Sequence, residues 1–192
     1  MKTHLIPALK LTLICILVFS GIYTVTIWGI GQIVAPNNGK GEIVNYVNSK
    51  ENLKYGFVNI GQSFTSDNYF WSRPSAVGYN AAGSGASNKG ATNEEYLALV
   101  QSRIDTFLIH NPNVAKSDIP VEMVTASGSG LDPNISPKAA MVQISRIAKA
   151  RNISESKVES LLNEYTEKPL LGMFGPARIN ILKLNIALDA LK

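Results

Sequence analysis

The chain has 192 residues, and 18 Lys and Arg against 14 Asp and Glu give it a formal net charge of +4. Two of the basic residues, Lys2 and Lys10, precede a long uncharged segment, which leaves 16 basic and 14 acidic residues for the rest of the chain. Such a balanced charge argues against a nucleic-acid groove, and we expect no nucleic-acid partner. The single cysteine, Cys15, excludes an intramolecular disulfide.

The segment 11–35 is apolar apart from hydroxyl groups, glycines and one glutamine. A helix of this length, about 37 Å, would cross a hydrocarbon core of about 30 Å with some tilt. A cleaved signal peptide is the alternative, but its apolar core would be only about 7 to 15 residues long, and Ile33 stands where cleavage needs a small residue. We therefore predict a short stub at 1–10 and a retained transmembrane helix at 11–35.

The lysines near the ends of this helix do not decide its orientation, because they lie on both sides: Lys2 and Lys10 against Lys40, Lys50 and Lys54. The layout is that of a signal anchor, which favours a cytoplasmic N-terminus. We expect a single-pass protein of the cell membrane with its C-terminal domain outside the cytoplasm.

The residues after the helix, 36–192, have the size of one domain. Strand-like and helix-like patterns both occur in it, which predicts a soluble α/β domain of the α+β kind. The stretch 79–92 (YNAAGSGASNKGAT) lacks apolar periodicity and is expected to be a flexible Gly/Ser/Asn loop. Residues 57–71 before it are expected to form short strands or turns packed on the core.

The first helix of this domain is expected to begin at Thr92, because Thr92 and Glu95 have the spacing of a capping box. Apolar residues then recur every three or four positions until Asn111 and Pro112. Residues 119–125 (IPVEMVT) are expected to form a short strand.

Two further helices are predicted to begin at Ser136, which is followed by proline, and at Ser154. The first of these should present one apolar face, formed by Met141, Ile144, Ile147 and Ala148. Residues 178–191 alternate at first and then change to helical spacing, which predicts a strand followed by a short helix.

Side chains suited to catalysis are scarce. His4 lies in the stub, so His110 is the imidazole available to the domain, and a catalytic triad would have to use it. A position at the end of a helix, near the negative end of its dipole, is the preferred explanation of His110. One histidine without a thiol partner does not make a His/Cys zinc site, so we expect no catalytic residue and no metal site.

Two glycine-rich segments could in principle cradle a phosphate. Residues 83–90 contain a lysine but lack the spacing of a phosphate-binding loop. Residues 127–137 precede a predicted helix but have no lysine in register. We interpret the first as loop and the second as an ordered turn.

The segment 125–143 (TASGSGLDPNISPKAAMVQ), with 147–151 after it, closely resembles the C subunit of the Kdp potassium-transporting ATPase. The resemblance extends through most of the chain, because 61–76 is similar to the aromatic block of that family and 180–189 to its C-terminal end. The chain departs from the family pattern at 174–177 and near Ala86, both outside the central motif.

The resemblance implies a non-catalytic accessory subunit of an ATP-driven potassium importer. Its partners would be a channel-like potassium-translocating subunit, a P-type ATPase subunit and a small single-span subunit. ATP and the potassium ion would be handled by the complex, and the chain would have no cofactor of its own. The family is described as a catalytic chaperone that raises the ATP affinity of the ATPase subunit.

Gln143 matches the glutamine proposed in that family to assist nucleotide binding. The alternative is a helical glutamine that faces solvent or a partner. If the domain lies outside, about 30 Å of hydrocarbon separates Gln143 from cytosolic ATP, so any effect on ATP would have to act through subunit contacts.

Candidate partner contacts fall in the span and in the central motif. Small and hydroxyl residues permit close helix approach and interhelical hydrogen bonds, which singles out Ser20, Gly21 and Thr24. The candidates in the domain are Ser127, Gly128, Ser129, Gly130, Asp132 and Arg73.

Two other classes of protein remain as alternatives. A pilin-like structural protein would typically carry an acidic residue in the first turns of its apolar helix, and 11–35 has none. A membrane-anchored hydrolase is disfavoured by the scarcity of histidine and thiol groups.

Overall fold

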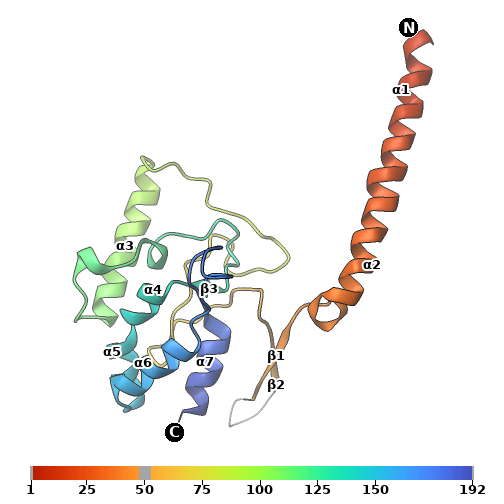
Figure 1. Ribbon diagram of the computed structural model, residues 1–192. Coiled ribbons are helices and arrows are strands. Elements are labelled where there is room, and N and C mark those ends of the chain that lie inside the picture. The colour runs from red at the N-terminus through yellow and green to blue at the C-terminus, as the bar shows by residue number, and fades with distance from the viewer. Residues whose placement is uncertain (1, 48–52, 192) are drawn as a thin grey trace. The chain divides into compact units, whose positions relative to one another are not determined.

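The computed structural model describes residues 2–47 and 53–191. The chain divides into two compact units, residues 1–42 and 43–192, and each is described by itself. The first unit contains the apolar segment, and the second contains the remaining α-helices and the two small sheets of the described residues (Figure 1).

The first unit is dominated by one uninterrupted helix. It consists of α1 (Lys2–Cys15), a π-helical segment η1 (Ile16–Tyr23) and α2 (Thr24–Val34), and a 3-10 turn, η2 (Pro36–Gly39), follows it. The part from His4 to Val34 is long and apolar enough to cross a membrane, and an 18-residue window within it has a mean hydropathy of 2.3. The helix therefore extends toward the N-terminus through most of the predicted stub. It ends before Pro36, because a residue that precedes proline is disfavoured in the helical conformation.

The second unit is a mixed helical and β structure, as the sequence pattern predicts. Its two antiparallel sheets have two strands each. β1 (Ile43–Val47) pairs with β2 (Leu53–Phe57), and β3 (Asn134–Ile135) pairs with β4 (Ile179–Asn180). The second pairing joins the central motif to the start of the C-terminal helix (Figure 1).

Helices make up most of the second unit. They are α3 (Glu94–His110), α4 (Pro137–Met141), α5 (Ile144–Arg151), α6 (Glu155–Glu164) and α7 (Ile181–Ala190), with short 3-10 turns η3 (Lys116–Asp118) and η4 (Val121–Met123). The predicted starts at Ser136 and Ser154 are confirmed, and the Ser136 hydroxyl accepts a hydrogen bond from the Ala139 amide at 3.2 Å. The predicted strand followed by a helix at the C-terminus is also confirmed.

Two local predictions are wrong, and a third is shifted by one residue. Residues 119–125 contain the 3-10 turn η4 and no strand, and the Thr125 amide and hydroxyl both bond to the carbonyl of Val121. The helix predicted from Ser136 is interrupted between α4 and α5, which leaves Met141 48% exposed. The first helix is capped by Asn93 rather than Thr92, because the Asn93 side chain accepts from the Tyr96 amide at 2.9 Å.

The core is formed where α3, α5, α6 and α7 meet the aromatic segment 61–77. Fully or nearly fully buried side chains include Phe70, Phe107, Ile147, Val158, Leu162, Leu184 and Leu188. Each contributes about 1.5 to 3 kcal/mol of hydrophobic stabilisation before entropic costs. The segment 58–93 reaches this core without helix or strand, and turns and side-chain hydrogen bonds hold it in place.

Candidate functional site

Gln143 lies at the break between α4 and α5 and is fully buried. Its side-chain oxygen accepts hydrogen bonds from the Trp71 amide and from Nη2 of Arg146, both at 2.8 Å. Its Nε2 donates to the carbonyl of Ala139 at 2.9 Å. The interpretation of Gln143 as a residue facing solvent or a partner is therefore wrong: its amide joins the aromatic segment to the helices.

Arg146 is the second buried polar group of this region. Its Nε donates to Asn111 Oδ1 at 3.2 Å and its Nη1 donates to the carbonyl of Asp67 at 2.8 Å. The guanidinium lies 4.5 Å from the centre of the Trp71 ring, which adds a cation–π contact. Burial lowers the pKa of Arg146 to about 10, opposed by the nearby Asp67 carboxylate, so the group stays charged at neutral pH.

His110 ends α3, as predicted, and pairs with an acidic residue that the sequence did not indicate. Its Nδ1 lies 2.8 Å from Asp67 Oδ1, and its ring packs edge-on against Trp71 with centroids 4.9 Å apart. The pair borders a pocket of about 480 Å³ between α3 and α5, which Arg146 and Ser145 also line. Nε, Nη1 and Nη2 of Arg146 all donate to protein acceptors, so the arrangement acts as a structural clamp on the turn at Asp67.

The ordered turn predicted at 127–137 is attached near its start to the loop that precedes α3. The carbonyl of Ser129 accepts from the Gly85 amide at 2.9 Å and from the Ser84 hydroxyl at 3.0 Å. The carbonyl of Gly130 accepts from the Ser75 hydroxyl at 2.7 Å. The Gly/Ser/Asn loop 79–92 has no helix or strand, but these bonds attach its middle to the central motif.

Arg73 and Asp132, both candidate partner contacts, form an ion pair at 2.7 Å. Both are partly exposed, and Nε of Arg73 is buried without a hydrogen-bond partner in the described part of the chain. Of the four residues of the SGSG turn, Ser127 and Gly130 are buried, whereas Gly128 and Ser129 are exposed. The structure thus brings the six domain candidates into one patch, of which Gly128 and Ser129 form the open part.

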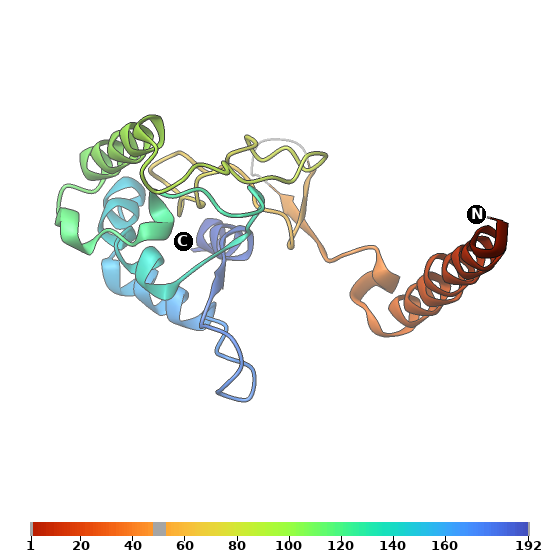
Figure 2. The same cartoon turned by 90° about the horizontal axis from the view of Figure 1, so that it is seen from above.

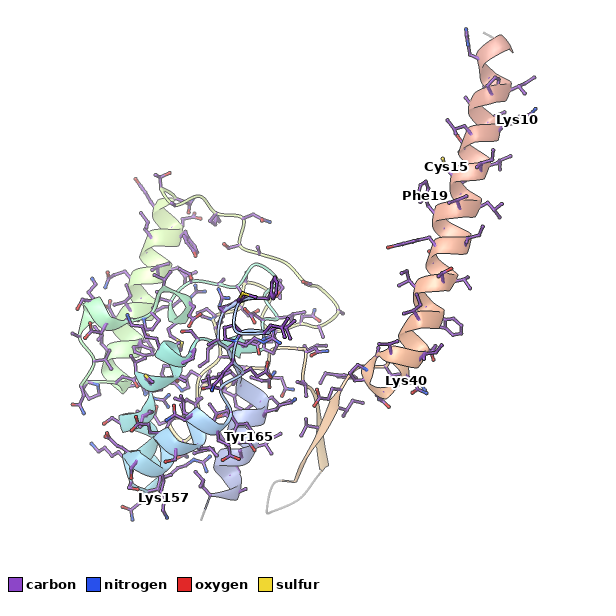
Figure 3. The ribbon with its side chains drawn as sticks, in the orientation of Figure 1. Lys10, Cys15, Phe19, Lys40, Lys157 and Tyr165 are labelled. Atoms are coloured by element: carbon purple, nitrogen blue, oxygen red, sulfur yellow. The ribbon has the colours of Figure 1, made fainter. Side chains whose placement is uncertain are left out.

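The span candidates lie at the middle of the long helix. Ser20 and Gly21 belong to the π-helical segment, and Thr24 begins α2. The Thr24 hydroxyl donates to the carbonyl of Phe19, at 3.2 Å, so its hydrogen is satisfied within the helix. A Cβ at Gly21 would meet no described atom within 4 Å, which leaves an open surface for a neighbouring helix. Figure 3 shows the side chains of this helix, with Cys15 and Phe19 labelled.

Three polar residues that sequence reasoning missed hold the aromatic segment in place. The side-chain amide of Asn185 bonds to both backbone groups of Phe70, and that of Asn180 donates to the carbonyl of Val58 at 2.8 Å. Arg151 donates to the carbonyl of Asn68 at 2.6 Å. A signal was available, because Asn185 interrupts the apolar face of the C-terminal helix, where a buried polar side chain needs a specific partner.

The candidates for chemistry are few in the described residues, where no group of three or more His, Cys, Asp or Glu could hold a metal ion. The polar groups of the domain instead serve to fix an irregular segment against helices.

Comparison with known proteins gives the family. The family model "K+-transporting ATPase, c chain" (KdpC) matches residues 5–190. The potassium-transporting ATPase KdpC subunit of Flavobacterium psychrophilum is 54% identical over 98% of this chain and 99% of its own length. Those of Bacteroides thetaiotaomicron, with 50% identity over 98% of both chains, and Geobacter metallireducens, with 42% over 96% of both, are similar. The chain belongs to the KdpC family.

Proposed function

We propose that the chain is the membrane-anchored accessory subunit of an ATP-driven potassium importer. In this role it stabilises the assembly and raises the ATP affinity of the P-type ATPase subunit, and it performs no chemistry itself. The observation that carries the proposal is the match to potassium-transporting ATPase c chains over almost the whole length, span included. The partners would be the channel-like subunit, the P-type ATPase subunit and the small single-span subunit.

The long apolar helix is the proposed attachment to these partners. Ser20 and Gly21 leave a shallow surface at its middle, and in lipid close packing and interhelical hydrogen bonds drive helix association. The π-helical turn adds to this, because such turns leave backbone carbonyls less tightly paired and are common at functional positions. A partner helix would lie along Gly21.

The patch at 127–132 is the proposed contact of the domain. Its backbone is fixed by bonds to Gly85 and Ser75, and it presents Gly128, Ser129 and the Arg73–Asp132 pair. A preformed surface loses little conformational entropy on binding, which favours a stable contact. We place this domain outside the cytoplasm, with the N-terminus inside.

The effect on ATP is proposed to act through subunit contacts. Direct use of Gln143 by a nucleotide would require its side-chain hydrogen bonds, among them those to Trp71 and Arg146, to break and the aromatic segment to move away. Leaving the buried partners unsatisfied would cost about 1 to 3 kcal/mol each. Burial of Gln143 therefore supports a structural role for this residue and an indirect route to ATP affinity.

Co-purification tests the proposed attachment. Tagged full-length chain is purified from detergent-solubilised membranes that contain the partner subunits, and the recovery of each partner is measured. Gly21→Leu should reduce that recovery strongly, because a bulky side chain separates the helices. Gly21→Ala is the matched control and should retain most of it. Equal recovery with Gly21→Leu and the unaltered chain would contradict the proposal.

A further inference from the structure

A short hairpin carries large apolar side chains away from the domain. Between α6 and β4 the chain runs out and back, with β-bridges that pair Glu167 with Arg178 and Leu170 with Phe174. Figure 2 shows this segment, in blue, as a loop that projects beyond the helices. We refer to residues 167–178 as the apolar hairpin.

The tip of the apolar hairpin is almost entirely exposed. Its large apolar side chains have exposed fractions between 60% and 78%: Leu170, Leu171, Met173 and Phe174. Isolated apolar side chains on a surface are ordinary, but contiguous apolar patches on a soluble domain mark sites of interaction. These side chains do not pack into the core of the domain, so they are available for contact with another molecule or with lipid.

Leu171 supports this interpretation through its backbone. Its φ of 54° lies in the left-handed region, where a residue with a Cβ is strained and Gly or Asn is favoured. It occupies the third position of a turn closed by the Gly172 amide and the Pro169 carbonyl at 2.9 Å. A leucine in this backbone conformation whose side chain is 78% exposed gains little stabilisation from burial, which points to a use for the side chain itself.

The backbone of the tip is largely closed on itself. The Leu170 amide donates to the carbonyl of Phe174, and the amides of Met173 and Phe174 both donate to the carbonyl of Leu170, at 2.9 to 3.2 Å. Pro169 and Pro176 have no amide hydrogen to satisfy. Hydrocarbon offers no hydrogen bonds to a backbone, whereas a protein partner does, so internal closure suits a lipid environment in particular.

The basic residues at the base of the hairpin are also consistent with a lipid surface. The nine residues 169–177 are uncharged, and Lys168 and Arg178 flank them. Both are exposed, and Arg178 bonds to Glu167 at 2.9 Å through Nε. Basic side chains at the edge of an apolar segment lay their stems along the apolar region and their cations among lipid phosphates.

We propose that the apolar hairpin inserts into the interfacial layer of the bilayer that holds the long helix, as a second membrane contact of the chain. This goes beyond the proposed subunit role and requires only that the helix spans the membrane. Eight residues, 35–42, separate Val34 from the first strand, and at full extension they cover about 30 Å. A connection of this length lets the start of the domain lie no farther than about 30 Å from the end of the helix.

Fluorescence with single cysteines tests the proposal in the full-length chain. An environment-sensitive fluorophore is attached to the native Cys15, to Leu171→Cys in a Cys15→Ser background, and to Lys149→Cys in the same background. Each protein is reconstituted in vesicles of phosphatidylcholine and phosphatidylglycerol, with and without lipids that carry a spin-label quencher. Cys15 reports on the span, and Lys149, exposed on α5, serves as the matched control in the domain.

The label at 171 should emit at shorter wavelength than the label at 149 and should be quenched by the spin-labelled lipids, as the label at Cys15 is. Adding Met173→Asp to the Leu171→Cys protein should abolish that quenching. A label at 171 that behaves like the label at 149 while Cys15 is quenched would overturn the proposal and leave the span intact. A shift to shorter wavelength that depends on the density of the protein in the vesicles would show that the hairpin contacts a second copy of the chain. A shift that appears only when the partner subunits are present would show that it contacts one of those subunits. Either outcome would also overturn the proposal.

Discussion

Asn185 pairs with Phe70 as one strand residue pairs with another. The Phe70 amide donates to Asn185 Oδ1 at 2.9 Å, and Asn185 Nδ2 donates to the Phe70 carbonyl at 3.0 Å. Both residues are buried, so no solvent replaces either bond. A side chain of α7 thus supplies the hydrogen bonds that a neighbouring strand would otherwise give to the aromatic segment.

Replacing Asn185 by Ala should therefore be strongly destabilising. It leaves a buried amide and a buried carbonyl unsatisfied, at about 1 to 3 kcal/mol each. The full-length chain in detergent should melt several degrees lower, at about 2 to 4 °C per kcal/mol for a protein of this size. Asn163→Ala, at an exposed position of α6, is the control and should melt like the unaltered chain. Similar melting of the two variants would refute the role given to Asn185.

Two glycines of the central motif differ sharply in what they tolerate. A Cβ at Gly130 would lie 2.6 Å from Val77 Cγ2 and 2.8 Å from the Gly85 carbonyl, and its φ of 68° already disfavours a side chain. A Cβ at Gly128 would meet no described atom within 4 Å. Gly130→Ala should displace the loop 79–92 and speed its cleavage by a protease, whereas Gly128→Ala should not. Equal cleavage rates would show that the loop does not depend on this contact.

Arg146 should be irreplaceable by lysine. A lysine keeps the charge but loses the planar group that bonds at once to Asn111, Asp67 and Gln143 and stacks on Trp71. We expect Arg146→Lys to cost about 2 to 4 kcal/mol, since hydrogen bonds from charged donors are worth about 1.5 to 3 kcal/mol each.

Arg178→Lys is the control for that variant. Arg178 is 59% exposed, and its pair with Glu167 lies on the surface, so this change should stay within about 0.5 kcal/mol. Denaturant midpoints of the two proteins decide the question. An Arg146→Lys midpoint equal to that of Arg178→Lys would mean that the charge alone matters.

Gln143→Ala separates a structural role from a nucleotide role. The variant should melt lower, because the Trp71 amide and Nη2 of Arg146 lose their shared acceptor. In complexes that still assemble, the KM for ATP should match that of the unaltered complex. Met141→Ala, two positions earlier and partly exposed, is the control for both measurements. A raised KM for ATP at unchanged melting temperature would instead favour contact between Gln143 and nucleotide.

The parts of the fold that local signals determine were predictable from the sequence. Ser136 with Pro137, Ser154 and the apolar periodicity after residue 93 all mark helices that the structure contains. The turn η4 was not predictable from the sequence, because the β-prone residues of this region bond to the carbonyl of Val121 rather than to a neighbouring strand. Propensity is a weak guide where tertiary contacts decide.

The buried polar residues of the site show the same limit of prediction from local sequence. Gln143 and Arg146 would be assigned to the surface by polarity, yet each is buried and bonds to the backbone of a segment more than 70 positions away. No local pattern encodes a partner at that distance. The resemblance to a family located the central motif, but no sequence pattern predicts that Ser129 bonds to the loop 79–92 or that Gly130 bonds to Ser75.

The proposed function is tested most directly by adding the purified chain to a complex that lacks it and measuring potassium-stimulated ATP hydrolysis. The chain alone should hydrolyse no ATP, and its addition should lower the KM for ATP of the complex without requiring any nucleotide bound to the chain itself. Hydrolysis by the chain alone, or a KM that does not change when the chain joins the complex, would contradict the account.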